Sequence, residues 1–494
     1  MALARSRSSG LPLAAAAAAC LLTLQLLLLL APPVSPSPAG RLPVGGLVKG
    51  GRALAGKVIS KFLKDQARDK LPELIPKDRR GNGGEGSLKW DDRSATDAGL
   101  FVFNLSVGTR LAQTINGVLD ISSQLTWTQC APCTACLPPP APTFHPDGSP
   151  SFARLPCASQ ICQDVLNGTT CGDVGDATTS DDCLGYEVTF SDGLTNTSGY
   201  LATDTFTFGD GETETGTATA VPGMVFGCSV DTYGDFSGAS GVIGLGRGPL
   251  SLVSQLGFSR FSYQLGHGDS DGGGTSETTT IRFGDAAKPQ MKRPRTTPLL
   301  TSSLNTQVYF VNLTGIRVDG NDLTDIPAGT FDLHADGSGG VFLSTTMPVT
   351  YLEQAAYDAV KRAIQAKLQL PPVDGSAAVG LDLCYTAESM AGVKAVPKLT
   401  LVFDGDDATM DLGRANYFFR DDDTGLECVT MRPSSGGSLL GSLLQAGTNM
   451  IYDVNSLQLT FETAAAAAAA ASRVVSPMMM TKIVAVVVCA ALLF

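Results

Sequence analysis

Apolar and polar residues alternate along much of the chain between residues 100 and 463, which is the pattern of half-buried β-strands. In "KLTLVF", Leu399, Leu401 and Phe403 fall on one face. The stretch "NMIYDVNSLQLTF" (449–461) predicts a hairpin that turns at Asn455-Ser456, because the alternation holds on both sides of that pair. Segments 203–210 and 307–318 alternate similarly. The body is therefore predicted to be mostly antiparallel β-sheet.

One stretch follows a helical period instead. In "EQAAYDAVKRAIQAKL" (353–368), Tyr357, Val360, Ile364 and Leu368 lie on one side of a helix. Residues 266–280 are rich in Gly, Ser, Thr and Asp and predict a loop. The fold class expected is all-β, with short helices.

Two pairs of motifs recur in the same order in the two halves of the body. "VLDISS" (118–123) is followed by "GVIGLGRG" (241–248), and "VFLSTT" (341–346) is followed by "SLLGSLLQ" (438–445). The apolar run of "VLDISS" ends at Asp120, and that of "VFLSTT" ends at Ser344. This order predicts a duplicated, two-lobed architecture, with lobes at 98–287 and 288–464.

Both ends of the chain carry apolar segments. Arg5 and Arg7 precede an apolar run, so residues 1–39 are expected to be a secretory signal; an uncleaved anchor is the alternative. Residues 465–494 combine a small-residue spacer with the terminal run "IVAVVVCAALLF", typical of a glycolipid-anchor signal. A short membrane anchor and a low-complexity appendix remain alternatives. The expected location is the secretory pathway and the cell surface.

Charge separates a basic leader from an acidic body. Residues 41–80 carry a net charge of +7, whereas the whole chain carries −12. Segment 40–97 is therefore interpreted either as a solvated leader or as a pro-segment that lies on an acidic cleft, with a cuttable linker at 76–86. The acidic body has no basic face for nucleic acid and no phosphate-binding loop.

Cysteine usage and sequons agree with secretion. Between the two terminal segments the cysteines form an even set, which favours disulfides over a metal knuckle, because the chain has only three His. No metal or cofactor is expected. The disulfide candidates are Cys130, Cys133, Cys136, Cys157, Cys162, Cys171, Cys183, Cys228, Cys384 and Cys428, and the glycosylation sequons are at Asn104, Asn167, Asn196 and Asn312.

These motifs resemble the nepenthesin-like plant branch of the pepsin-type aspartic proteases, over roughly residues 98–463. "LDISSQLTWTQCAPCTAC" resembles that branch's "IDTGSDLTWTQC-x-P-C-x-x-C", and "VTYLEQAAYDAV" resembles its helix after the second catalytic loop. "VFGCSVDTYGDFSGASGVIGLGRGPLSLVSQLGFSRFSYQL" and "LLGSLLQAGTNMIYDVNSLQLTF" also match. The resemblance implies a bilobal pepsin-like fold with a central cleft, and an inhibitory role for the basic leader.

The family's chemistry needs two carboxylates. Held about 3 Å apart, they share one proton, and one acts as base on a water while the other donates to the substrate carbonyl. Each Asp lies in Asp-Thr/Ser-Gly, where the hydroxyl braces the two loops against each other. The Gly lets the two backbones approach closely, because it has no Cβ.

The chain departs from this pattern in both loops. Asp120 matches the first catalytic Asp, but Ile121 stands in place of the bracing hydroxyl and Ser122 in place of the Gly. In the second loop Ser344 occupies the position of the second catalytic Asp, and Thr346 replaces the Gly. A Ser hydroxyl cannot hold the shared proton. The resemblance therefore implies an incomplete dyad and a catalytically inactive homologue.

Further departures lie around these loops. The family's flap motif "YGDGS" reads "FSDGL", which places Phe190 at the flap Tyr and assigns Asp192 and Gly193 to the flap. Met347-Pro348 replaces two Thr after the second loop, and Gln264 replaces a Cys. One family disulfide is therefore expected to be absent or rewired.

Other chemistries have weaker support in the sequence. A Ser nucleophile would need a base, and His145, His267 and His334 stand in isolated loop contexts. Asp332 and Asp336 precede the second loop and suit an ordinary turn better than a substitute acid.

Three functions follow as hypotheses. One is a non-catalytic, monomeric protein that binds or inhibits a polypeptide or protein ligand in the cleft, such as a secreted glycosidase. Another is an acid endopeptidase with residual activity through Asp120. The last is a cell-surface scaffold.

Overall fold

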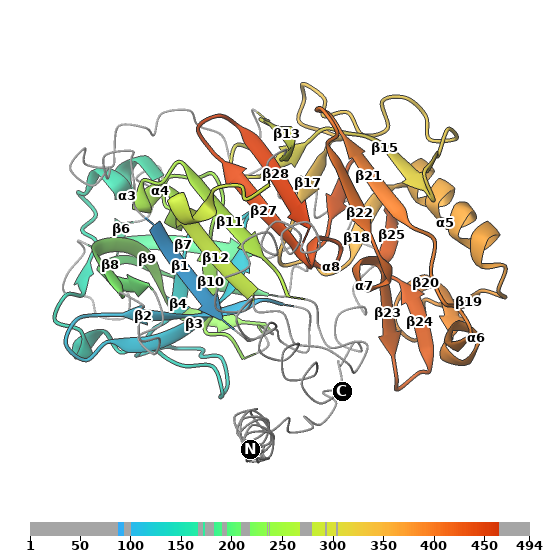
Figure 1. Cartoon of the computed structure of the whole chain (residues 1–494). Coiled ribbons are helices and arrows are strands. Elements are labelled where there is room, and N and C mark those ends of the chain that lie inside the picture. The colour runs from blue at the N-terminus through green and yellow to red at the C-terminus, as the bar shows by residue number, and fades with distance from the viewer. Residues whose placement is uncertain are drawn as a thin grey trace, which may run out of the picture. The chain divides into compact units, whose positions relative to one another are not determined.

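Strands dominate the fold, and its N-terminal and C-terminal halves form two β-rich lobes (Figure 1). The computed structural model describes residues 87–92, 100–165, 171–172, 182–189, 195–208, 218–234, 236, 238–266, 279–291, 294–302 and 305–463. All of them belong to one compact unit, residues 41–464. Within these ranges, no helix is both long and apolar enough to cross a membrane.

The largest sheet joins the two lobes. Its strand order is β1 (Ser87–Asp92), β12 (Thr279–Gly284), β11 (Arg260–Gln264), β27 (Thr448–Asp453), β28 (Gln458–Thr463), β13 (Arg295–Leu300), β14 (Phe310–Val311), β17 (Val341–Leu343), β26 (Ser438–Leu440), β18 (Thr350–Glu353) and β25 (Met431–Ser434). The junction is the antiparallel pair β11–β27. Strand β1 follows directly after the expected linker 76–86, so a cut in that linker would leave β1 on the body.

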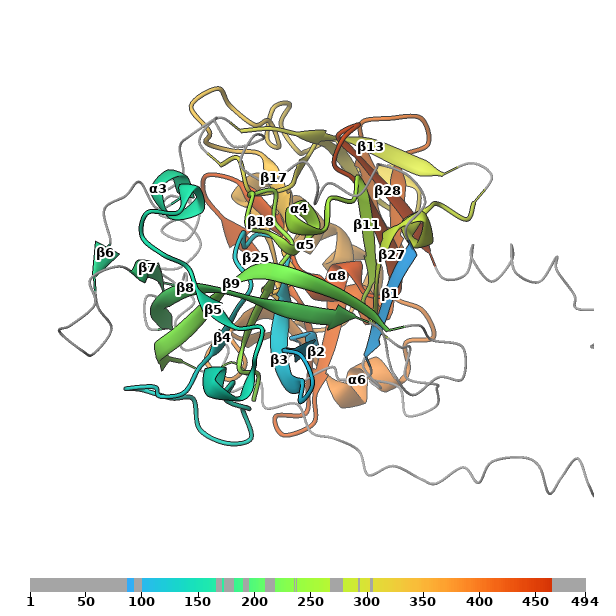
Figure 2. The same cartoon turned by 90° about the vertical axis from the view of Figure 1, so that its left-hand side faces the viewer.

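The N-terminal lobe is built on a second sheet, whose long strands β8 and β9 run across it in Figure 2. The order is β2 (Val102–Val107), β3 (Gln113–Asp120), β10 (Gly241–Gly244), β4 (Trp127–Gln129), β9 (Thr219–Tyr233), β8 (Asn196–Phe208), β7 (Asp182–Thr189) and β6 (Cys171–Gly172), with β5 (Ala153–Arg154) paired to β8. Its helices are α3 (Gln160–Val165), α4 (Leu252–Leu256) and the 3₁₀ turns η2 (Pro146–Gly148) and η3 (Asp285–Ala287).

Two smaller sheets complete the C-terminal lobe. One has the order β16 (Asn321–Asp322), β15 (Leu313–Val318), β21 (Leu399–Phe403) and β22 (Thr409–Leu412). The other has β19 (Val373–Gly375), β20 (Leu381–Thr386), β24 (Leu426–Val429) and β23 (Phe418–Asp421). The helices of this lobe are α5 (Gln354–Leu368), α6 (Ala387–Ala391), α7 (Arg414–Tyr417) and α8 (Ser442–Gln445).

The periodicity predictions are confirmed in the described residues. Strand β21 buries Leu399, Leu401 and Phe403, and β27 and β28 form the predicted hairpin. Helix α5 begins one residue later than the pattern indicated and buries Tyr357 and Val360 among others. Helix α5 follows its pattern because it packs one face on the core and leaves the other toward water, whereas both faces of β27 are buried.

The internal repeat has a structural counterpart. Strand β3 pairs in parallel with β10, and β17 pairs in parallel with β26. In both lobes a further strand then crosses over antiparallel, β4 onto β10 and β18 onto β26. A Cβ at Gly244 would lie 2.8 Å from the carbonyl oxygen of Leu125, and one at Gly441 would lie 2.6 Å from that of Pro348. The glycine in each motif is therefore required by this close crossing.

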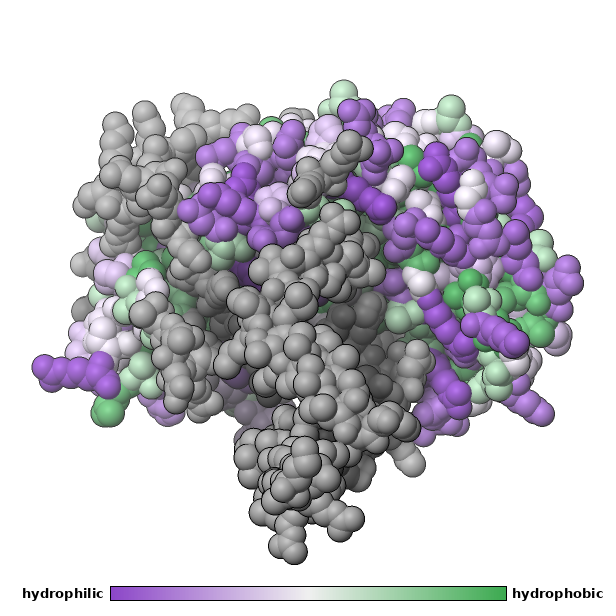
Figure 3. Space-filling model, viewed as in Figure 1, coloured by the Kyte–Doolittle hydropathy of each residue, from purple (hydrophilic) through white to green (hydrophobic). Residues whose placement is uncertain are grey.

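The strands that carry the site are buried in one apolar cluster. It extends from Phe103 and Leu119 in the N-terminal half to Val341 and Leu343 in the C-terminal half. In contrast, hydrophilic residues dominate the outer face of the C-terminal lobe in Figure 3. Because close-packed cores resist deformation, the ends of β3 and β17 are held in fixed positions.

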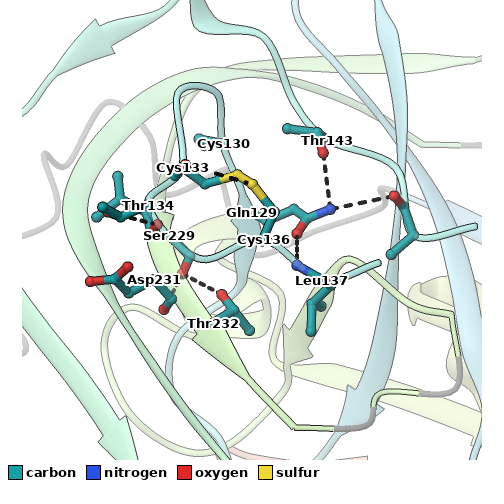
Figure 4. Close-up of a disulfide and its surroundings, with 12 residues drawn as sticks. Gln129, Cys130, Cys133, Thr134, Cys136, Leu137, Thr143, Ser229, Asp231 and Thr232 are labelled. Atoms are coloured by element: carbon teal, nitrogen blue, oxygen red, sulfur yellow. Dashed lines mark hydrogen bonds between the residues drawn. A yellow bond between two sulfur atoms is a disulfide. The ribbon is translucent and has the colours of Figure 1, made fainter. Parts of the chain in front are cut away.

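Disulfides reinforce the N-terminal lobe, as the cysteine count predicted. Cys130 and Cys228 join the end of β4 to β9, and Cys133 pairs with Cys136. Figure 4 shows this loop, where Gln129 accepts a hydrogen bond from the amide of Leu137. The other described pairs are Cys162–Cys183 and Cys384–Cys428, and Cys157 is also disulfide-bonded.

Candidate functional site

Asp120 lies at the carboxyl end of β3, where it is 4% exposed. The amide of Leu245, just after β10, donates to the carbonyl of Asp120 (2.8 Å), which fixes the backbone there. One carboxylate oxygen accepts hydrogen bonds from the amide (2.8 Å) and the hydroxyl (2.6 Å) of Ser122. The carboxylate is thus bound within its own loop, and Ser122, the residue at the position of the family's Gly, supplies both donors, one of them through a hydroxyl that Gly lacks.

Burial raises the pKa of Asp120, and hydrogen bonding from Ser122 and Ser123 offsets part of this rise. The charged form has lost its hydration, and the two donors of Ser122 replace it only at one oxygen. Folding therefore raises the affinity of Asp120 for a proton relative to the unfolded chain. A carboxyl can accept or donate a single proton, and in the described part of the chain the hydrogen bonds given for the Asp120 side chain come from Ser122 and not from a second acid.

Asp120→Asn is expected to stabilise the protein at neutral pH. A raised folded-state pKa means that the folded protein binds more protons, so the contribution of Asp120 to the free energy of unfolding falls as pH rises above the ordinary value of 3.8. The Asn variant should be more stable than the natural protein at pH 7. This difference should shrink toward pH 3, as measured by urea unfolding at both pH values.

Asp319→Asn is the matched control. Hydrogen bonding to the side chain of Lys367 lowers the pKa of Asp319, so this substitution should destabilise the protein at pH 7 and have less effect in acid. Equal responses of the two variants to pH would contradict the burial of an isolated acid at Asp120.

Ser344 follows β17 at the equivalent point of the second lobe and is 3% exposed. Its amide donates to the carbonyl of Leu440 on the parallel neighbour β26 (3.1 Å). Its hydroxyl accepts from the amide of Met347 (3.2 Å) and lies 3.3 Å from the hydroxyl of Thr346. The contacts of the hydroxyl stay within its own loop, whereas the amide bonds to the neighbouring strand.

Thr345 links the two loops across the lobe boundary. Its hydroxyl donates to the carbonyl of Leu119 (2.6 Å) and accepts from the amide of Ile121 (3.3 Å). All three residues are fully or almost fully buried. Ile121 has no hydroxyl to return a bond, so the bracing that the resemblance implies is present from one side only.

A polar network behind the second loop was missed by the sequence reasoning. The side-chain amide of Gln445 in α8 donates to the carbonyls of Ser344 (2.9 Å) and Leu440 (3.0 Å). Its oxygen accepts from the hydroxyl of Tyr263 on β11, which also lies 2.9 Å from that of Tyr452 on β27. Gln445 ends the motif "SLLGSLLQ", and a polar residue closing an apolar run was the available signal.

The alternative catalytic groups do not join this site in the described part of the chain. Asp336 accepts hydrogen bonds from the amide (3.0 Å) and hydroxyl (2.6 Å) of Ser338, an ordinary turn. The backbone of His145 bonds to the side chain of Gln113, and that of His334 to Ser338 and Gly337. None of the hydrogen bonds described for Ser344 involves a histidine.

Several predicted positions lie outside the described residues. These are the flap residues Phe190, Asp192 and Gly193, the sequon at Asn167, His267, and both terminal segments. Among the other sequons, Asn104 is exposed on β2, Asn196 begins β8, and Asn312 lies between β14 and β15. Asp120 and Ser344 themselves sit at equivalent strand ends, as the repeat predicted.

Comparisons with known proteins fit this geometry. Residues 101–285 match the family model described as xylanase inhibitor N-terminal, and residues 308–463 match xylanase inhibitor C-terminal. Aspartic proteinase nepenthesin-2 from Nepenthes gracilis is 38% identical over 74% of this chain and 77% of its own length. The chain belongs to the nepenthesin-like branch of the plant pepsin-like aspartic protease family.

Other relatives extend the comparison. Aspartyl protease family protein 2 from Arabidopsis thaliana is 34% identical over 74% of this chain and 70% of its own length. Among solved structures, that of edgp superposes with a TM-score of 0.61, covering 77% of this chain and 96% of that one. Since those two sequences are only 19% identical, this match supports the pepsin-like fold alone.

Proposed function

We propose that this nepenthesin-like protein is a secreted, non-catalytic member of its family that binds a polypeptide or protein between its lobes. The proposal rests on the hydrogen bonds of the two loops that hold Asp120 and Ser344. Asp120 bonds to Ser122, and the hydroxyl of Ser344, in the second carboxylate's position, bonds within its own turn. A hydroxyl there cannot share a proton with Asp120 at acidic pH, so the general acid of the family reaction is missing.

A secreted glycosidase is the partner that we propose first. The family models matching both halves of the chain are described as xylanase inhibitors, and the described core keeps both lobes and their shared sheet. A binding function needs that framework but no proton transfer. We further propose that the protein acts as a monomer outside the cell, held at its surface by the C-terminal segment.

An acid endopeptidase is the second candidate, supported by the 38% identity to nepenthesin-2. Asp120 would then act with a partner other than Ser344. Losing one acid–base partner typically lowers the rate about 10²- to 10⁴-fold, so this activity would be weak.

The secreted protein should bind endo-xylanases without cleaving unfolded protein. The reason is that a ligand can occupy the space between the lobes without any acid–base chemistry. Binding would be measured by calorimetry against a panel of secreted xylanases, and cleavage by hydrolysis of unfolded globin between pH 2 and pH 6. Nepenthesin-2 is the positive control for cleavage, and the heat-denatured protein is the negative control for binding.

The outcomes separate the candidates. Saturable binding with no cleavage supports the inhibitor-like function. Pepstatin-sensitive cleavage that Asp120→Ala abolishes would overturn it in favour of the endopeptidase. Absence of both activities would reject both candidates and leave the scaffold hypothesis.

A further inference from the structure

An exposed aromatic ring lies directly across the sheet from a sequon asparagine. Tyr233, the last residue of β9, is 55% exposed and is the only exposed large aromatic side chain among the described residues. In the register of β8 and β9 its partner is Asn196, the first residue of β8. Directly opposed residues of antiparallel strands point to the same face, with Cβ atoms about 5 Å apart.

The opposite face of the same strand ends is buried and hydrogen-bonded. The hydroxyl of Thr197 lies 2.6 Å from that of Ser229 and 3.2 Å from that of Thr232. Thr197 pairs with Thr232 in the sheet, next to the pair Asn196–Tyr233. This polar cluster fixes the register, because a one-residue slip would expose the buried hydroxyls. Asn196 and Tyr233 are thereby held side by side on the solvent face.

The chain turns sharply after Tyr233. Gly234 has φ +123°, and a Cβ at this position would lie 2.5 Å from side-chain atoms of Thr195. Gly234 therefore places no side chain next to the ring, and Tyr233 keeps 55% of its surface exposed. A partly exposed Tyr on a fixed sheet presents an apolar ring that ends in a polar hydroxyl. Such a side chain can pack against a ligand that has both apolar and polar groups.

We propose that Asn196 carries an N-linked glycan whose first N-acetylglucosamine packs on the ring of Tyr233. The modification requires passage through the secretory pathway, as in the proposed function. There the side-chain nitrogen of Asn196 forms a bond to C1 of the first sugar and loses a proton, while the lipid diphosphate leaves from C1 of a lipid-linked oligosaccharide. The apolar face of the attached sugar then covers Tyr233 and stabilises the ends of β8 and β9.

The chain supplies its own control sequon. Asn104 is exposed on β2, but the residue opposite it in β3 is Asn116. A glycan at Asn104 therefore has no aromatic ring at the opposed position. The two sites share a strand setting and differ in the residue across the sheet, so the effect of the ring can be measured within one protein.

The test uses the full chain secreted from eukaryotic cells behind a heterologous signal, so it does not depend on the natural leader. Glycopeptide mass spectrometry gives the occupancy of each sequon. Ser198→Ala and Ser106→Ala each remove one sequon and keep its asparagine. Ser198→Ala is expected to lower the melting temperature by about 1–3 °C, and Ser106→Ala to leave it nearly unchanged.

The variant Tyr233→Ala tests whether the stabilising contact of the sugar is with this ring. In this background, removal of the Asn196 glycan should have no further effect on melting, because the surface that the sugar covered is gone. Trimming the natural protein to a single N-acetylglucosamine should retain the stabilisation. An unmodified Asn196 would overturn the proposal, and so would a glycan effect that survives Tyr233→Ala. Neither result bears on xylanase binding or peptide hydrolysis, so this proposal and the proposed function fail separately.

Discussion

Rebuilding the family's two catalytic loops is expected to raise acid peptide hydrolysis by about 10²- to 10⁴-fold over the natural protein. The variant combines Ile121→Thr, Ser122→Gly, Ser344→Asp and Thr346→Gly and retains Thr345. The amide at position 122 still donates to Asp120 (2.8 Å in the natural protein), while removal of its hydroxyl releases one carboxylate hydrogen bond. Asp120 can then share a proton with the new acid at position 344.

Two variants control this experiment. Ser344→Asp alone should gain much less, because Ser122 still occupies the oxygen of Asp120 and Ile121 still provides no hydroxyl. The rebuilt variant with Asp120→Ala should return to the background rate. Hydrolysis of unfolded globin between pH 2 and pH 6, with and without pepstatin, measures the gain. A folded rebuilt variant with no gain in rate would contradict the assignment of Ser344 to the second carboxylate's position.

Thr345→Val is expected to destabilise the protein by about 2–6 kcal/mol. Valine keeps the shape of the side chain but removes the hydroxyl that bonds to the carbonyl of Leu119 and the amide of Ile121. Both backbone groups are buried, and each unsatisfied buried group costs about 1–3 kcal/mol. Urea unfolding at neutral pH measures the loss.

The neighbouring position supplies the control for this prediction. Thr346 is only half-buried, and its hydroxyl lies 3.3 Å from that of Ser344 without reaching the other lobe. Thr346→Val should therefore cost less than about 1 kcal/mol, and Thr345→Ser should largely preserve stability. If Thr345→Val and Thr346→Val were equally stable, the one-sided link between the lobes would have no energetic role.

The hydrogen bonds at positions 122 and 344 show how each loop satisfies its buried polar groups. A buried carboxylate needs hydrogen bonds, and Ser122 supplies two of them to Asp120 from within the same loop. Ser344 avoids the problem, because a neutral hydroxyl buried at 3% exposure needs less compensation than an ion. The substitutions at 122 and 344 thus form a consistent pair, in which each loop satisfies its own polar groups.

Local sequence patterns were enough to predict much of the fold. The helical period around Val360 reports burial on one side of α5, and the alternation around Leu399 marks the apolar face of β21, whose other face holds the buried Thr400 and the half-buried Val402. The motif that contains Gly244 recurs around Gly441, and this repeat predicted the duplication. Both positions need glycine because another strand crosses close to each of them. These features depend on neighbours close in sequence or on a steric demand that only Gly meets.

Periodicity and the order of the motifs are local properties, and they were enough to predict the β-rich class, the duplication, and the placement of Asp120 and Ser344 at equivalent strand ends. The contacts of these residues, in contrast, depend on how distant segments of the chain pack together. The bond from Thr345 to Leu119 spans 226 residues and the network from Gln445 to Tyr263 spans 182. Hydrogen bonds between distant segments follow from how strands pack, and no local pattern encodes them.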